Sequence, residues 1–265
     1  MHVANFRTPG PMQMDAWQFS LGDGTMLPML MPWQGMLSLA SASPARIKPK
    51  ALVETEPDLS YLFVLCLNPK RGISEADLMA AAASLEIEVA IIRAISEVES
   101  PRGPFDPMGR PEILFERHHF HRHTGGRFDK SAPDLSNPNM GGYGKFSAQY
   151  PKLERAYALD RSAALRSCSW GRFQILGSNH AEAGLPSVTE FVIAMTRAES
   201  EHLKAFIAFI KADKKKLGAL QKKDWAAFAA KYNGSGYKKN NYDTKLAEAY
   251  AKWAAIEAAK PAARK

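Results

Sequence analysis

Two glutamates, Glu97 and Glu99, close a predicted helix in the first half of this 265-residue chain. Side chains two positions apart on an α-helix differ in direction by about 200°, so these carboxyl groups cannot share a face. Glu97 stands four positions after Arg93 and is expected to pair with it on the surface. Glu99 instead continues an isoleucine stripe formed by Ile91, Ile92 and Ile95. Glu99 is therefore the better candidate for chemistry.

The predicted surroundings of Glu99 favour a proton on its carboxyl group. A carboxyl group on an apolar helix face is desolvated, which raises its pKa. Glu99 also lies in the last turn, where the helix dipole disfavours negative charge. A glutamic acid that is protonated near neutral pH can donate its proton to a glycosidic oxygen. The alternative is a glutamate at the helix end that bends out into water.

Glu116 is the candidate for a second carboxylate. Glycoside hydrolysis commonly uses two, about 5 Å apart in retaining enzymes and about 6.5–9.5 Å apart in inverting ones. Glu116 closes a strand-like run that begins at Glu112, and it could equally be a structural partner of a nearby arginine or histidine. Asp106 and Asp129 have the sequence context of turn residues.

Four histidines lie close together, at His118, His119, His121 and His123. No cysteine accompanies them, and in an extended segment His119, His121 and His123 would share a face without a carboxylate between them. We expect these imidazoles to pack or hydrogen-bond near the site, and we expect no metal and no cofactor.

The elements that must position these groups are mainly helical. Ser74 is a predicted N-cap, because acids follow it in the first turn. Pro101 ends the helix that carries Glu99. Residues 101–148 are rich in Gly, Pro, Asn and Asp, which predicts loops and a small β-hairpin subregion. Helices are predicted over residues 74–84, 86–100, 151–166, 172–183, 187–213, 216–220, 224–232 and 240–258.

Residues 1–70 differ from the rest of the chain in their Met, Pro and Ser content. The apolar run from Tyr61 to Leu67 is typical of a buried strand, although a short helix also fits. We expect an irregular N-terminal segment over residues 1–70, with a role in delivery, binding or packing. A catalytic domain over 71–258 and a basic tail over 259–265 follow it.

The amino-acid composition and charge point to a globular protein with polyanionic partners. Apolar residues make up 46% and charged residues 23%, as in soluble globular proteins, and the net charge of +8 favours polyanionic partners. No apolar run reaches the roughly 18 residues that span a bilayer, and residues 26–42 are a poor match to a signal peptide. Motifs for binding nucleic acid are missing. Cys66 and Cys168 are expected to be reduced and buried.

Four segments of the chain occur in a familiar order, namely Glu97–Ser100, Gly109–His118, Ser169–Gly177 and Tyr232–Gly236. Together they resemble the N-acetylmuramidase domain of phage endolysins, within the lysozyme-like superfamily, over roughly residues 71–258. That family usually has glycines after its Glu-Ser pair, whereas Pro101 and Arg102 precede Gly103 here. This difference affects the shape expected for the rim of the substrate cleft beside Glu99.

The resemblance implies a mainly α (α+β), lysozyme-like fold. It also implies hydrolysis of the β-1,4 bond between N-acetylmuramic acid and N-acetylglucosamine in peptidoglycan glycan strands. Glu99 falls where the family has its general acid, and we expect a monomer. The candidate substrate-binding residues are Trp170, Gln174, Tyr232 and Asn233, whereas Phe173 is expected in the core.

Two other functions stay open. A lytic transglycosylase would cleave the same bond and form an anhydro sugar, and a non-catalytic wall-binding protein could retain the fold. The expected setting is synthesis in the bacterial cytoplasm followed by action on the cell wall from the periplasm. A phage endolysin would get there by holin release, and an antibacterial effector by a secretion system.

Overall fold

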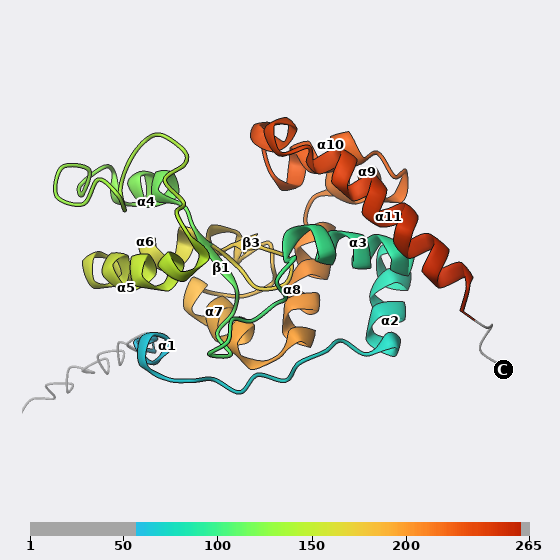
Figure 1. Cartoon of the computed structure of the whole chain (residues 1–265), viewed down its shortest axis with the longest axis horizontal. Helices are drawn as coiled ribbons and strands as arrows, with labels where there is room; N and C mark the ends of the chain where they lie inside the picture. The colour runs from blue at the N-terminus through green and yellow to red at the C-terminus, as the bar shows by residue number, and fades with distance from the viewer. Residues whose placement is uncertain (1–56, 261–265) are drawn as a thin grey trace, which may run out of the picture. The chain divides into compact units, whose positions relative to one another are not determined.

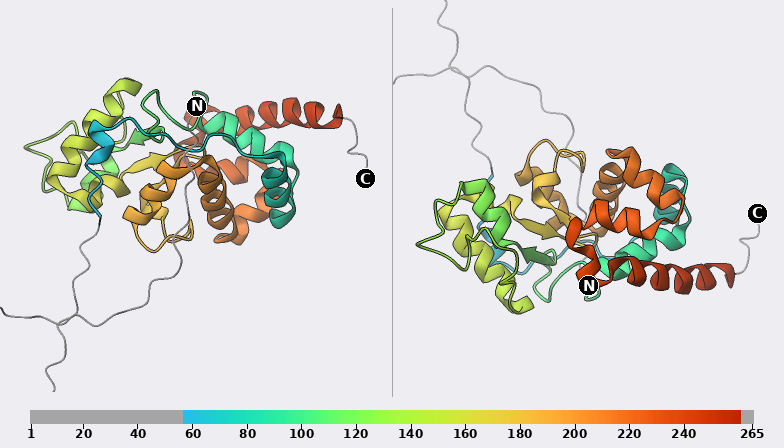
Figure 2. Two further views of the ribbon diagram at one scale, coloured as in Figure 1. Left: turned by 90° about the horizontal axis from the view of Figure 1, so that it is seen from below. Right: turned by 90° about the horizontal axis from the view of Figure 1, so that it is seen from above.

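The computed structural model describes residues 57–260, in which helices α3 (Val89–Glu99) and α11 (Tyr242–Ala258) pack against each other (Figure 1). The stripe of isoleucines on α3 is fully buried, as the sequence predicts. The α3 helix ends at Glu99 with Ser100 as its C-cap, directly before Pro101. The C-terminal half of α11 extends past the other helices (Figure 2).

Glu97 lies on the surface as expected, but its predicted partner is wrong. The Lys252 ammonium donates to both Glu97 carboxylate oxygens at 2.9 Å, and the Trp253 indole N–H donates at 2.8 Å. Arg93 instead pairs with Glu75 and with Glu257. The (i, i+4) rule failed here because α11 offers partners from far along the chain, and these tie the two helices together.

The other helices of the described residues are short. They are α1 (Tyr61–Val64), α2 (Glu75–Leu85), α4 (Arg117–Thr124), α5 (Gln149–Leu159), α6 (Arg161–Arg166), α7 (Val188–Arg197), α8 (Glu199–Lys211), α9 (Lys214–Gln221) and α10 (Trp225–Tyr232). Side chains cap several of them, including Ser74 on α2 and Ser187 on α7. The helix predicted over 151–166 is broken at Asp160, which is extended and caps α6. The helix predicted over 187–213 is broken at the extended Ala198.

A three-stranded antiparallel sheet supports the centre of the domain, with strand order β1 (Ile113–Phe115), β2 (Cys168–Trp170), β3 (Ile175–Leu176). Ile113 pairs with Trp170, and Ser169 pairs with Leu176. The helix predicted over 172–183 is therefore wrong. Gly171 and Gln174 have positive φ angles of 68° and 46°, which turn the chain into a hairpin.

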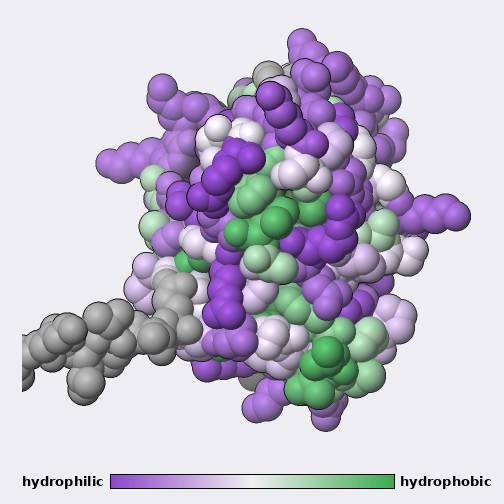
Figure 3. Space-filling view, turned by 90° about the vertical axis from the view of Figure 1, so that its left-hand side faces the viewer, coloured by the Kyte–Doolittle hydropathy of each residue, from purple (hydrophilic) through white to green (hydrophobic). Residues whose placement is uncertain are grey.

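Residues 57–70 pack onto the same body as the helices that follow. Within the run 61–67 the structure forms the short helix α1, the alternative to a buried strand, and the side chains of Leu59 and Leu62 are fully buried. Residues 57–70 thus contribute buried side chains to the same core as the helices that follow. Cys168 is buried as predicted, but Cys66 is exposed. On the face that carries α1, α5 and α6, apolar side chains gather mainly in two areas among hydrophilic ones (Figure 3).

An ion pair between Arg172 and Glu199 joins four parts of the domain. Glu199 begins α8, is only 3% exposed and also accepts a hydrogen bond from the backbone of Gly72. Arg172, in the β2–β3 turn, donates to the Ser96 hydroxyl on α3 at 2.6 Å, and its backbone N–H donates to His202 at 3.0 Å. The pair thus fixes the hairpin against α8 and against the helix that ends at Glu99.

Replacing Glu199 by Ala is expected to lower the free energy of unfolding by about 3 kcal/mol, because Arg172 loses its buried counter-charge. Urea denaturation measures this loss. The matched control is Glu201→Ala on the same helix, whose exposed pair with Lys204 contributes less than about 1 kcal/mol. Equal losses in the two variants would contradict the structural role given to the Arg172–Glu199 pair.

Candidate active site

The Glu99 carboxyl group is held by side chains from two distant segments. Its Oε1 accepts a hydrogen bond from the Asn233 amide at 3.0 Å, and the Tyr242 hydroxyl also bonds to it. Burial raises the pKa of Glu99 to about 7, and the two hydrogen bonds oppose this rise because they favour the carboxylate. Glu99 is therefore a substantially protonated acid near neutral pH, as its place on the isoleucine stripe predicts.

Asn233 is placed by α10, which it follows directly as the C-cap. The Tyr232 hydroxyl donates to the backbone carbonyl of Phe173 at 2.6 Å, and its ring packs against those of Phe209 and Phe228. Tyr232 thus anchors the end of α10 to the β2–β3 turn. Its hydroxyl is engaged within the protein, so Tyr232 holds Asn233 in position.

Glu116 lies at the corner between β1 and α4, where it is the N-cap residue of α4. Its side chain is 15% exposed, and burial raises its pKa. The Tyr143 hydroxyl donates to Glu116 Oε2 at 3.4 Å. Burial, followed by the charges of Glu99 and Glu116, raises the pKa of Tyr242. The charges of both carboxyl groups therefore act on the Tyr242 hydroxyl.

The aromatic and amide side chains of the β2–β3 hairpin that were considered for substrate binding have different surroundings in the structure. Trp170 is 1% exposed, and its indole N–H donates to Leu165 O at 3.0 Å, so its ring is a core group and cannot stack on a sugar. Phe173 is buried, as expected. Gln174 is partly exposed, and its amide nitrogen donates to the carbonyls of Gly171 and Glu112, which stabilises the turn.

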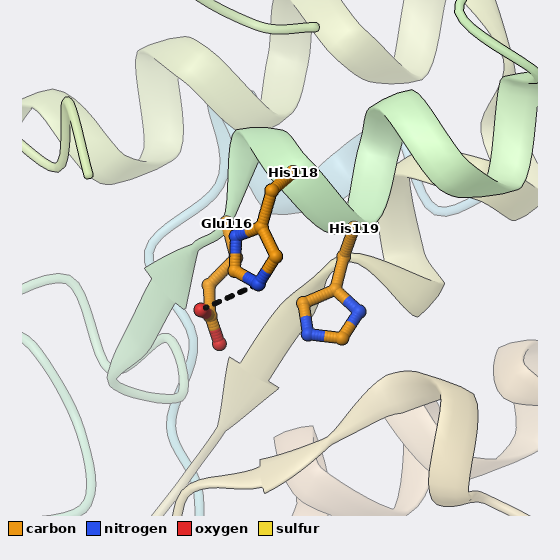
Figure 4. A group of neighbouring side chains, drawn as sticks. All are labelled: Glu116, His118 and His119. Carbon is orange, nitrogen blue, oxygen red and sulfur yellow. Dashed lines mark ion pairs between the residues drawn. The ribbon is translucent and has the colours of Figure 1, made fainter. Parts of the chain in front are cut away.

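The histidines belong to a helix, and the extended segment predicted for them is wrong. On α4, His121 bonds to Asp129 through Nδ1 at 2.8 Å, and the ring of His123 stacks on that of His119. His118 and His119 lie beside Glu116 (Figure 4), with the possible ligand atoms of the three residues within 4.8 Å of one another. Burial, aided by nearby positive groups, lowers the pKa of His119 to about 3.

The two remaining acids are turn residues, as predicted. Asp106 accepts hydrogen bonds from the backbone N–H groups of Met108 and Arg110, each at 2.9 Å. Asp129 accepts from the Ser136 hydroxyl as well as from His121. Their oxygens are engaged in local structure, which leaves Glu116 as the second carboxyl group near Tyr242.

A cavity of about 710 Å³ lies on the loop side of β1, and its lining does not include Glu99. Glu112 lines it, burial raises the Glu112 pKa to about 7, and Glu112 Oε1 has no hydrogen-bond partner among the described residues. We favour Glu99 as the acid because Asn233 and Tyr242 orient its carboxyl group. Sequence reasoning overlooked Glu112 and Tyr242, since no local pattern marks either residue.

A carboxylic acid with a raised pKa at the end of a helix, in a mainly helical domain with a small sheet, is the arrangement expected of the lysozyme-like class of glycoside hydrolases. The sequence profile of the N-acetylmuramidase family matches residues 88–254. The chain therefore belongs to the N-acetylmuramidase family and is a peptidoglycan hydrolase.

A solved structure supports this assignment. The crystal structure of the Burkholderia AP3 phage endolysin is 42% identical in sequence and superposes with a TM-score of 0.63. The match covers 71% of this chain and 73% of that one. None of the curated proteins matches this chain. The expected lysozyme-like fold is confirmed.

Replacing Tyr242 by Phe is expected to raise the pKa of Glu99, because the variant removes a hydrogen bond that favours the carboxylate while keeping the ring. The alkaline limb of the pH–rate profile should move to higher pH. The control is Tyr250→Phe on the same helix, whose hydroxyl bonds to Glu88 and Lys223 instead. A limb that stays in place in the Tyr242 variant would contradict the contact with Glu99.

Proposed function

We propose that this chain hydrolyses the β-1,4 bond between N-acetylmuramic acid and N-acetylglucosamine, with Glu99 as the general acid. The observation that carries this proposal is the Glu99 pKa of about 7, which leaves a proton available at neutral pH on a carboxyl group oriented by Asn233 and Tyr242. Donation of that proton to the glycosidic oxygen makes the departing sugar a neutral alcohol, which lowers the barrier to bond cleavage.

Glu116 is the proposed group that orients the attacking water. It is the second carboxyl group whose charge acts on Tyr242, and although burial raises its pKa, the hydrogen bond from Tyr143 and the charge of Arg122 oppose that rise. A protonated acid and an ionised carboxylate in different surroundings are the pair that glycoside hydrolysis requires. In the alternative role, Glu116 supports the β1–α4 corner by accepting the hydrogen bond from Tyr143.

Asn233 and Gln174 are the proposed polar contacts to the glycan. Asn233 Oδ1 is buried and has no hydrogen-bond partner among the described residues, so it retains the capacity to accept a hydrogen bond from a substrate amide or a water that enters beside it. Tyr232 supports the proposed contact of Asn233 by anchoring the end of α10 to the β2–β3 turn. Trp170 is left out of the substrate site because its ring is buried in the core.

The relationship to the Burkholderia AP3 phage endolysin supports a bacteriolytic role of the same kind. We propose that the protein acts as a monomer on the wall from the periplasm, after release by a holin. Delivery as an antibacterial effector is the second candidate, in which residues 1–56, outside the described structure, serve delivery or wall binding. No helix over residues 57–260 has the length and apolar character needed to cross a membrane.

Replacing Glu99 by Gln should reduce the hydrolysis of purified peptidoglycan by at least about a hundredfold, because the amide cannot donate the acidic proton. Release of soluble muropeptides measures the rate. Binding to insoluble peptidoglycan should persist, since the side chain keeps its shape. Undiminished release by this variant would rule out Glu99 as the acid.

Stability measurements control for misfolding in this variant. The Glu99 pKa lies above its unfolded value, so the wild type loses stability as pH rises from about 5 through 7. At pH 8 the Gln variant should be more stable by at most about 3 kcal/mol, which corresponds to a pKa of about 7 against 4.5. Below pH 4.5 the difference should vanish, because the acid is protonated in both states.

Mass spectrometry of digested peptidoglycan distinguishes the reaction types. A hydrolase adds water and leaves a reducing N-acetylmuramic acid end, whereas a transglycosylase leaves an anhydro end that is lighter by one water. We expect reducing ends as the main product. Anhydro ends as the main product would establish transglycosylation, and the absence of soluble products would establish a non-catalytic wall-binding protein.

A further inference from the structure

The Glu116 carboxylate lies beside the imidazole rings of His118 and His119, but no hydrogen bond joins it to either ring. Glu116 Oε2 lies 3.7 Å from His118 Nε2, which is longer than a hydrogen bond, and it receives only the long bond from Tyr143. No hydrogen bond to a ring nitrogen of His119 occurs among residues 57–260. Glu116 and His119 are partly exposed, and His118 Nδ1 is buried without a hydrogen-bond partner among the described residues, so the protein leaves ligand atoms of this cluster free.

We propose that Glu116, His118 and His119 bind a divalent transition-metal ion of the zinc class. Two imidazole nitrogens and one carboxylate oxygen are a common donor set for Zn²⁺, with bonds of about 2.0–2.2 Å. The three donor atoms lie within 4.8 Å of one another, so rotations that draw them in by about 1 Å bring all three onto one ion. Figure 4 shows the carboxylate and both rings on the same side of the β1–α4 corner.

The local backbone explains why these residues converge. Glu116 is extended, with φ −113° and ψ 98°, and His118 and His119 occupy the first turn of α4 directly after it. The carboxylate therefore turns back toward the first helical turn, where it meets both rings. His121, which is committed to Asp129, stays outside the cluster.

Positive charge near the cluster limits its affinity for zinc. Arg117 and Arg122 lie close enough to act on the neighbouring histidines, and the N-terminus of α4 is itself a positive end. Arg117 donates to the carbonyls of Asn139 and Met140. The site should therefore bind zinc more weakly than a structural zinc site of four protein ligands.

The consequence for activity rests on the proposed function. A bound ion would occupy the carboxylate that is proposed to orient water, near Tyr242 and Glu99, so zinc should inhibit the enzyme reversibly. Mg²⁺ and Ca²⁺ should not, because they prefer oxygen ligands to imidazole.

Two measurements on the full chain test the metal site. Isothermal titration with Zn²⁺ is done in the Glu99→Gln background, where catalysis plays no part, and is repeated with His119→Gln or His121→Gln added. Digestion of purified peptidoglycan by wild type, His119→Gln and His121→Gln is then followed with and without Zn²⁺, each relative to its own rate without metal. A chelator added afterwards tests reversibility.

We expect His119→Gln to weaken zinc binding by more than about tenfold and to relieve inhibition, because losing a ligand costs at least as much as losing a supporting group. His121→Gln should behave like its parent. Equal zinc affinity in the His119 and His121 variants would overturn the site. Zinc binding that depends on His119 but leaves activity unchanged would support the site and contradict the role of Glu116 in hydrolysis.

Discussion

The partly buried carboxyl group of Glu99 is costly to ionise, and several elements combine to impose that cost. The isoleucines of α3 remove water from one side, while Asn233 after α10 and Tyr242 at the start of α11 supply the two hydrogen bonds that orient it. The Arg172–Glu199 ion pair holds the end of α3 against the hairpin and α8 through Ser96. The acidity of one side chain thus depends on packing that extends across the domain.

Glu99 could be predicted because its evidence is local. Helical periodicity separates it from Glu97, and both the apolar stripe and the helix dipole act within one helix. The hairpin around Gln174 could not be predicted, because positive φ angles at isolated positions leave no periodic signal. The prediction of Trp170 as a sugar-binding residue was wrong because β2, which buries its indole in the core, was not predicted. Tyr242 was overlooked because only the packing of α11 on α3 brings it to Glu99.

The β1–α4 corner shows how one wrong element changes a chemical interpretation. In an extended segment the histidines would alternate along a face that lacks a carboxylate. In the helix, His118 and His119 lie in the first turn beside Glu116. The group of possible metal ligands is therefore Glu116, His118 and His119, in place of the three alternating histidines. The same corner carries the carboxylate proposed to orient water, so the two proposals place two kinds of chemistry at a single backbone bend. Residue types alone identified the participants but not their grouping.

The distribution of the Glu99 partners along the chain has a consequence for biosynthesis. Glu99 ends α3, whereas Asn233 and Tyr242 lie more than a hundred residues later. A ribosome-bound chain that has exposed the acid has therefore not yet exposed the groups that orient it. Activity should appear only when α11 has emerged and docked on α3, so unfinished chains would be harmless to the cell that makes them. If Glu99 is the acid, the order of synthesis should itself delay lytic activity until α11 has been made.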